Sequence, residues 1–131
     1  MKGGINIMKF QYADDVKELA KIVNEKFELK LNLERIAFIR SQGSRSKAIA
    51  RTLMLPSQWR FILSPSILYI VEVISEKYDN LPCEEKAYVI LHELTHIPNS
   101  MKGGLRNHNH PHFRKIKKPP YKELKEICKH I

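Results

Sequence analysis

The sequence predicts one α+β domain that spans residues 1–131. Three observations lead to this fold class: apolar residues at helical spacing near the amino terminus, short β-branched runs in the middle of the chain, and a second helical pattern that begins at Pro82. We therefore expect an N-terminal helix, a small sheet of three to four strands, a second long helix and a short C-terminal helix. A chain of 131 residues is sufficient for one hydrophobic core but not for two.

The first predicted helix lies in the segment YADDVKELAKIVNEKF, residues 12–27. Its apolar residues recur at helical spacing and predict one buried face. They are Val16, Leu19, Ala20, Val23 and Phe27. Asp15 and Glu18, three residues apart, resemble a capping box at the start of the helix.

The predicted strands follow this helix. Residues 34–41 and 47–55 indicate two strands joined by a turn at Gly43–Ser44, and Pro56 ends the second. A short strand is expected before Pro65, and a longer one runs from Ile67 to about Ile74. The longer strand is nearly continuous in apolar residues, which is typical of a covered strand. Its one charged residue, Glu72, is expected to face the surface at an edge.

The second long helix is predicted between Pro82 and Pro98. Proline suits the first turn of a helix, and Pro98 ends it because proline cannot donate a backbone hydrogen bond. One apolar stripe at i, i+3, i+4 and i+7 predicts the buried face. It consists of Ala87, Ile90, Leu91 and Leu94. His92 and His96 align with Tyr88 on a different face.

The seven residues HELTHIP, from His92 to Pro98, carry the chemistry of this helix. Two histidines four apart project from the same helix face and can bind one metal ion. Neutral imidazole is a good zinc ligand, and Glu93 can take a proton from a water molecule that the metal activates. This spacing, HExxH on a helix, is typical of zinc hydrolases. We therefore predict one zinc ion bound by His92 and His96, with Glu93 as the catalytic general base.

A catalytic zinc ion keeps three protein ligands and an open position. A loop that turns at Gly103–Gly104 can bring His108 back over the helix. His110 precedes Pro111 and should be extended, so that His108, His110 and His112 would form one row. Glu123 on the C-terminal helix is the carboxylate alternative. For oxyanion stabilisation, Arg106, Tyr88 and Tyr121 are candidates among which spacing does not choose.

The last part of the chain is strongly basic. The whole sequence has a net charge of +9, and residues 98–131 hold nine basic and two acidic side chains. After Pro119–Pro120, the segment YKELKEICKHI predicts a helix with Leu124, Ile127 and Cys128 inward. The basic segment 114–131 is a possible nucleic-acid contact, although a solubilising tail is the commoner role of such charge.

Composition and cysteine content predict the cellular location of the protein. No apolar run approaches the ~20 residues of a membrane span, so we expect no membrane partner. The opening MKGGINIMKF lacks an apolar h-region, so no secretory signal is expected. Cys83 and Cys128 form no CxxC pair, and we expect them to be unpaired in a cytoplasmic protein, with a single Cys83–Cys128 bridge as the less favoured alternative.

The stretch from about Tyr69 to His108 resembles a known family. IVEVISEKYDNL, EEKAYVILHELTHIP and GGLRNH are similar to the metallopeptidases of the archaeal and phage type, small relatives of the SprT-like zinc proteases. The resemblance implies a zincin-like fold in which a strand precedes the HExxH helix and a downstream histidine completes the metal site. By position that histidine is His108. The family more often has proline where Asn107 stands, which leaves His108 in register.

These observations together predict a zinc-dependent metallopeptidase that hydrolyses peptide or protein substrates. His92, His96 and His108 are the predicted ligands, and water is the nucleophile. Two alternatives stay open at this point. One is a non-catalytic zinc protein, in which His110 joins the other histidines as a fourth ligand. The other is a SprT-like protease that the basic segment brings to proteins bound to nucleic acid.

Overall fold

The structure, a computed structural model, describes residues 7–131. In chain order the elements are β1 (Lys9–Tyr12), α1 (Asp14–Lys26), the 3-10 helix η1 (Leu33–Arg35), β2 (Ile36–Gln42), β3 (Ala50–Met54), α2 (Ser57–Leu63), β4 (Tyr69–Ile74), α3 (Ser75–Tyr78), α4 (Cys83–Thr95), α5 (Pro111–Ile116) and α6 (Tyr121–Cys128). Helices and a four-stranded sheet share one core, which confirms the predicted α+β class.

The sheet is mixed and has the strand order β1-β2-β4-β3. β2 and β4 are parallel, whereas β1 pairs antiparallel with β2 and β3 pairs antiparallel with β4. The two strands predicted around Gly43–Ser44 therefore exist as β2 and β3, but they are not neighbours. β4 lies between them, and β3 is an edge strand.

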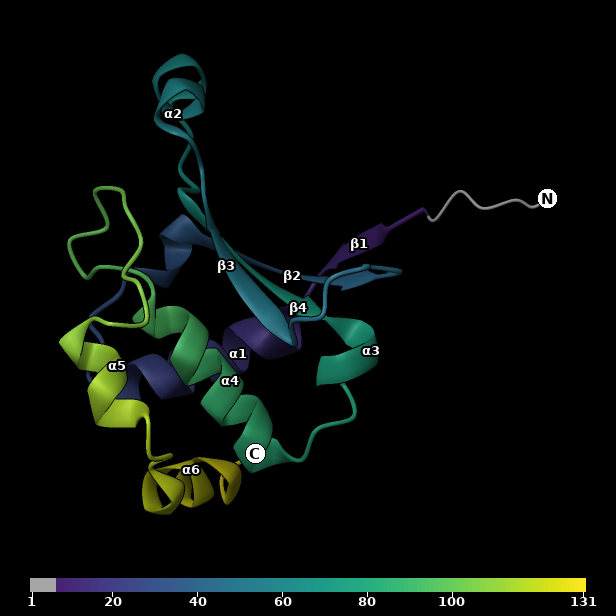
Figure 1. The fold of residues 1–131 in the computed structure, drawn as a ribbon, viewed down its shortest axis with the longest axis vertical. Helices are drawn as coiled ribbons and strands as arrows, with labels where there is room; N and C mark the ends of the chain where they lie inside the picture. Colours follow the sequence, from purple (N-terminus) through teal and green to yellow (C-terminus); the bar gives the residue numbers. More distant parts are fainter. Residues whose placement is uncertain (1–6) are drawn as a thin grey trace.

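Helices α1 and α4 pack against one face of the sheet, and α6 packs on the outer side of α4 (Figure 1). Alternating residues of β2 and β4 are buried beneath the helices, among them Ile36, Phe38, Val71 and Val73. The predicted apolar stripe of α4 is fully buried, as the periodicity required. The same holds for Leu124 and Ile127 of α6. These contacts fix α4 firmly between sheet and helices, and α4 is the helix that carries HELTH.

The start of α1 differs from the predicted capping box. Ala13 is the N-cap residue and no side chain caps the helix. Asp15 instead accepts two hydrogen bonds from the guanidinium of Arg40, at 2.7 and 3.0 Å. The prediction was wrong because Arg40, on the neighbouring strand β2, offers the carboxylate a bidentate charged partner.

The short strand predicted before Pro65 is also wrong. Residues 57–63 form α2, which begins after Pro56, ends at Ser64 in a left-handed conformation and buries none of its residues. Its run of apolar residues suggested a strand, but the segment leaves the sheet and protrudes at the top of Figure 1. The longer strand of the pair is confirmed as β4.

Glu72 is buried rather than at an exposed edge, with 1% of its surface accessible. β4 is a central strand, so the neighbours of Glu72 on both sides supply partners. Ser41 of β2 donates a hydrogen bond of 2.7 Å, and Arg51 of β3 forms an ion pair at 3.1 Å. A buried carboxylate needs such partners, because desolvation disfavours its charged form.

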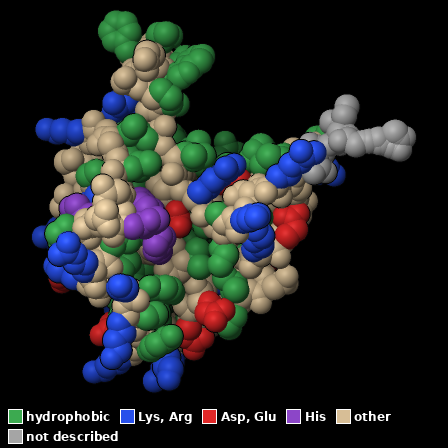
Figure 2. All heavy atoms as spheres, viewed as in Figure 1, with side chains coloured by type: hydrophobic (Ala, Val, Ile, Leu, Met, Phe, Trp, Pro, Cys, Tyr) green, Lys and Arg blue, Asp and Glu red, His purple; other side chains and the backbone are tan. Residues whose placement is uncertain are grey.

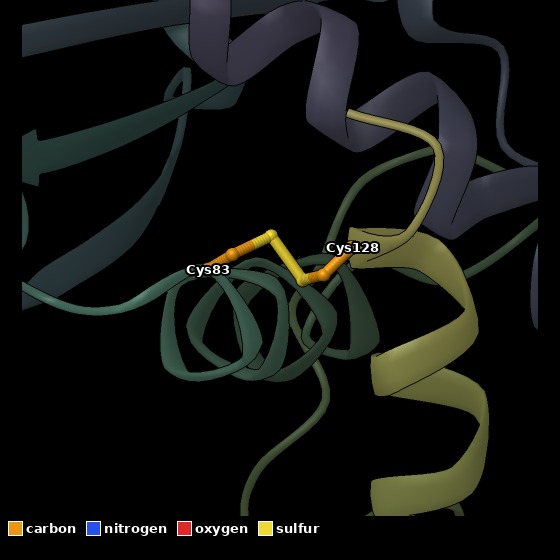
Figure 3. Close-up of a disulfide and its surroundings, with 2 residues drawn as sticks. All are labelled: Cys83 and Cys128. Carbon is orange, nitrogen blue, oxygen red and sulfur yellow. A yellow bond between two sulfur atoms is a disulfide. The ribbon is translucent and has the colours of Figure 1, made fainter.

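Cys83 and Cys128 form a disulfide, contrary to the expectation of two unpaired cysteines (Figure 3). The bond joins the first residue of α4 to the last residue of α6, with the two Cα atoms 5.9 Å apart. α6 packs against α4 so that these two helix ends meet, which a sequence separation of 45 residues concealed. The cysteines therefore give no argument for a cytoplasmic location, which stays a prediction.

Among the described residues no helix has both the length and the apolar character needed to cross a membrane. The expectation that the chain has no secretory signal falls mostly on residues 1–6, which lie outside the described residues.

Candidate metal centre

The HELTH motif occupies the last turn of α4. His92 lies within the helix and His96 is its C-cap residue, still in a right-handed helical conformation. Because the helix continues to this point, the two side chains remain on one face, and their ring centroids are 5.1 Å apart. Ile97 is completely buried, and Pro98 follows it. The chain then leaves the helix axis toward the sheet.

The loop after Pro98 returns to the helix and carries His108 with it. The backbone N–H of Arg106 donates to the carbonyl oxygen of His96 at 2.7 Å. This hydrogen bond attaches the second half of the loop to the end of the helix. The backbone N–H of Gly103 donates to the Tyr69 hydroxyl oxygen at 3.1 Å. Gly103 and Gly104 both have positive φ, at 117° and 80°, and make the turn possible without a Cβ clash.

His92, His96 and His108 form one cluster. Each offers a ligand atom, and these atoms all lie within 4.8 Å of one another. The Nε2 atoms of His92 and His108 are 3.2 Å apart. Two nitrogens bound to one tetrahedral zinc ion at 2.0–2.1 Å would be separated by about 3.3 Å. Figure 2 shows a group of histidine side chains at the surface on this face. The three residues therefore fit a single metal ion.

Phe113 of α5 supports all three rings. Its ring centroid lies 5.0, 4.6 and 5.1 Å from those of His92, His96 and His108, and its side chain is buried. An aromatic ring packed on three imidazoles restricts their rotation and excludes water behind them. Phe113 was not predicted from the sequence, since no helix was expected at residues 111–116.

The protonation of the histidines suits metal binding. Burial, reinforced by the neighbouring His96 and His108, lowers the pKa of His92 to about 4. His92 is therefore neutral at physiological pH, as a ligand must be. The Nδ1 atom of His96 lies 2.7 Å from the carbonyl oxygen of Arg106. Because a carbonyl can only accept, Nδ1 carries the hydrogen and Nε2 keeps its lone pair for a metal.

Glu93 lies beside this cluster with its side chain almost fully buried. Burial raises the pKa of the carboxyl, while a hydrogen bond from Thr52 and the nearby His108 act in the opposite direction. The Thr52 hydroxyl on β3 is 2.9 Å from Glu93 Oε1. This contact holds the carboxylate at a fixed place beside the histidines. No signal in the sequence connects Thr52 with Glu93, because 41 residues separate them.

A family model described as "Putative phage metallopeptidase" matches residues 8–131. The chain belongs to this family. No curated protein and no solved structure shows significant similarity to it. The family description implies a metallopeptidase, and the histidine cluster is where a metal ion can bind. The predicted kinship with SprT-like proteases stays a prediction.

The other candidate ligands of this metallopeptidase lie elsewhere. His108 and Asn109 form a turn, His110 is the N-cap of α5, and its Nδ1 accepts a hydrogen bond from the backbone N–H of His112. The extended row predicted for residues 108–112 is therefore wrong, because the chain turns into a helix at Pro111. His110 and His112 pack edge to face, with ring centroids 4.6 Å apart. Glu123 lines a different cavity, together with His112 and Arg106.

A cavity of about 440 Å³ opens beside the histidine cluster. Its lining includes His92 and His108, with apolar surface from Tyr88, Phe113 and Ile116 and charge from Arg114 and Lys117. Of the three oxyanion candidates, only Tyr88 reaches this cavity, and its hydroxyl donates to the carbonyl oxygen of Ile116 at 2.7 Å. Arg106 points toward the carbonyl of Thr95 and Tyr121 is exposed.

Proposed function

We propose that the protein is a zinc-dependent peptidase, with zinc bound by His92, His96 and His108 and with Glu93 as general base. The observation that carries the proposal is the convergence of three imidazoles on one point beside a buried glutamate. Three histidines leave one position of a tetrahedral zinc ion open, which is the arrangement of catalytic zinc sites. His110 packs edge to face on His112 and accepts a hydrogen bond from its backbone N–H, which favours this over a closed structural site with four ligands.

A zinc ion at this site would acidify a water molecule and polarise the carbonyl group of the substrate. Glu93 accepts the proton of the attacking water and delivers it to the leaving amine. Burial suits both roles, because it raises the pKa of the carboxyl toward the pH at which the group accepts and releases a proton readily. Thr52 holds Glu93 in place, and Phe113 keeps the ligand rings in their orientation.

The substrate is an extended peptide that pairs with the free edge of β3. This strand lies at the edge of the sheet, and its Thr52 contacts Glu93. An edge strand offers backbone donors and acceptors that an added strand can use. A peptide on β3 would therefore pass directly over the general base. One of its side chains would enter the 440 Å³ cavity beside His92 and His108.

The test is to measure zinc content and casein cleavage on the same samples of wild type and Glu93→Gln. We expect both proteins to bind one zinc ion per chain, and the variant to lose cleavage by about 10²–10⁴-fold, the usual contribution of a general base. Glu123→Gln is the matched control, since it neutralises a carboxylate that lines the other cavity. Zinc-loaded wild type without any cleavage activity, on casein or on a peptide library, would refute the proposal.

A further inference from the structure

Helix α2 exposes more apolar surface than a helix of its length ordinarily does. Four of its seven residues are large and hydrophobic, and all four are exposed. Trp59 is 55% accessible, Phe61 87%, Ile62 69% and Leu63 58%. A contiguous apolar group on a protruding element marks an interaction surface rather than a random surface position. Figure 2 shows this group as the green tip above the histidine cluster.

Two hydrogen bonds hold this apolar tip, the side chains of Trp59, Phe61, Ile62 and Leu63, in place relative to the rest of the structure. The backbone N–H of Leu55 donates to the carbonyl oxygen of Leu68 at 2.9 Å, which closes the neck between β3 and β4. The Arg60 guanidinium donates to the carbonyl oxygen of Lys102 at 3.1 Å, which ties α2 to the loop that leads to His108. These two contacts attach α2 both to the sheet and to the loop that leads to His108.

The sequence segments that contain α2 and the adjacent loop have no acidic side chains. Residues 35–71, which include α2 and its neck, contain six Lys or Arg and no Asp or Glu. Residues 97–122, which include the adjacent loop, contain seven Lys or Arg and no Asp or Glu. Arg40 and Arg51 are engaged in ion pairs, but Arg60 and Lys102 lie at the foot of α2. The exposed tip of α2 is apolar, and the residues at its foot, where it meets the rest of the protein, are the cationic Arg60 and Lys102.

We propose that α2 docks the protein on an anionic lipid bilayer. Trp59, Phe61, Ile62 and Leu63 enter the boundary between headgroups and acyl chains, and Arg60 and Lys102 contact the anionic headgroups. Aromatic and aliphatic residues above basic ones are the composition of interfacial membrane elements, and tryptophan favours this boundary. One short helix gives weak, reversible binding, which basic residues strengthen in a salt-dependent manner. This peripheral contact differs from a membrane span and does not rest on the peptidase proposal.

Other occupants fit the tip less well. A second copy of the chain would bring two cationic surfaces together, and a seven-residue helix offers far fewer than the 20–30 residues per side of a stable interface. A nucleic acid would pair with Arg60 and Lys102 but would leave the aliphatic Ile62 and Leu63 in water. A bilayer accommodates both the apolar tip and the basic foot.

The chain supplies its own reporter, because Trp59 is its one tryptophan. The zinc-loaded protein is titrated with vesicles of phosphatidylcholine alone and with vesicles of phosphatidylcholine and phosphatidylglycerol in equal parts. We expect Trp59 emission to shift to shorter wavelength, and the protein to co-sediment, with the mixed vesicles only. Added salt should weaken both signals. Equal binding to both vesicle types would overturn the anionic assignment, and no shift with either would overturn the proposal.

A paired variant locates the contact. Phe61→Ser with Ile62→Ser removes two exposed side chains and keeps Trp59, so we expect correct folding and at least ~10-fold weaker vesicle binding. Phe10→Ser with Tyr12→Ser removes two exposed aromatic residues from β1 and should bind as wild type does. Equal loss in both variants would refute the role of α2. A Trp59 shift that appears with protein concentration or with an oligonucleotide, but not with vesicles, would assign the tip to a second copy or to nucleic acid instead.

Discussion

The Thr52 hydroxyl oxygen lies 2.9 Å from Oε1 of Glu93 and 3.0 Å from the carbonyl oxygen of the same residue. A single side chain of the edge strand β3 therefore contacts both the carboxylate and the backbone of the residue between the ligand histidines of α4. This contact joins the strand proposed to bind the substrate to the group proposed to move the proton. A carboxylate held in this way needs no rearrangement when the substrate arrives.

Removing the Thr52 hydroxyl should therefore reduce turnover without removing the metal. Thr52→Val keeps the shape and the β-branch of the side chain but leaves Glu93 without its hydrogen-bond donor. We expect kcat to fall about 10–100-fold, the usual effect of losing a partner of a catalytic group, with zinc content unchanged. Thr52→Ser, which keeps the hydroxyl, should restore most of the activity. An unchanged kcat in Thr52→Val would show that Glu93 is positioned without this contact.

The third metal ligand can be identified by comparing three alanine variants. His108→Ala should lose most of its zinc, because the Nε2 atom of His108 lies 3.2 Å from that of His92 at the proposed metal position. His110→Ala and His112→Ala should retain zinc, since these rings pack edge to face on each other and are not part of the histidine cluster. Metal content after dialysis against a weak chelator is the measurement. Loss of zinc from His110→Ala as well would support the closed, non-catalytic site.

Local pattern sufficed to predict the elements that position the site. Helical spacing predicted α1, α4 and α6 with their buried residues, because an amphipathic helix fixes its own inward face. His92 and His96 share a face for the same local reason. A continuous apolar run predicted β4, and the glycine pair predicted the loop that returns His108 to the helix.

Features that depend on distant partners were not predictable. Glu72 is buried because β4 lies between β2 and β3 in the sheet, where Ser41 and Arg51, 31 and 21 residues away in sequence, flank it. The Cys83–Cys128 bond and the contact of Thr52 with Glu93 each require the packing of elements more than 40 residues apart. α2 misled the prediction for a different reason: its apolar residues are exposed, so burial does not impose a helical period on them.

The cavity beside the metal should select acidic side chains. Arg114 and Lys117 supply the two charges of its lining, and the remaining side chains are aromatic, apolar or neutral polar. We expect peptides with Glu or Asp next to the cleaved bond to have a kcat/KM about 10-fold above those with Lys, for a contact near the surface. Arg114→Ala with Lys117→Ala should abolish this preference while cleavage of a neutral peptide persists. Lys122→Ala with Lys125→Ala removes equal charge outside the cavity and should leave the preference intact.

Stability should depend on pH through the ion pairs of Arg40. The guanidinium of Arg40 donates two hydrogen bonds to Asp15 and lowers the pKa of its carboxyl below the usual 3.8, although burial opposes this. Because the folded-state pKa is depressed, the contribution is fully present above the unfolded value and is lost as pH falls through the folded one. Asp15→Asn should destabilise the metal-free protein by less than about 1 kcal/mol at neutral pH, since the carboxylate is largely exposed.

Denaturant titrations across pH give the measurement for Asp15→Asn. The difference from wild type should be constant above about pH 5 and should shrink below about pH 4. Metal-free protein is required, because metal binding needs deprotonated ligands and would add its own pH dependence to the measured stability. A difference that persists into strong acid would mean that Asp15 acts through packing and not through its charge.

Reducing the Cys83–Cys128 bond should destabilise the fold but spare the site. The bond closes a loop of about 45 residues in the unfolded chain, which corresponds to about 4 kcal/mol in the chain-entropy model. Reductant should therefore lower the denaturation midpoint of wild type and leave Cys83→Ser with Cys128→Ser unaffected. Two free thiols in the untreated protein would contradict the bond. Cys83 is the first residue of α4, whereas His92 and His96 lie at its other end, where the sheet, Phe113 and the returning loop hold them. Below the unfolding transition, reduced protein should thus keep its zinc and its cleavage rate.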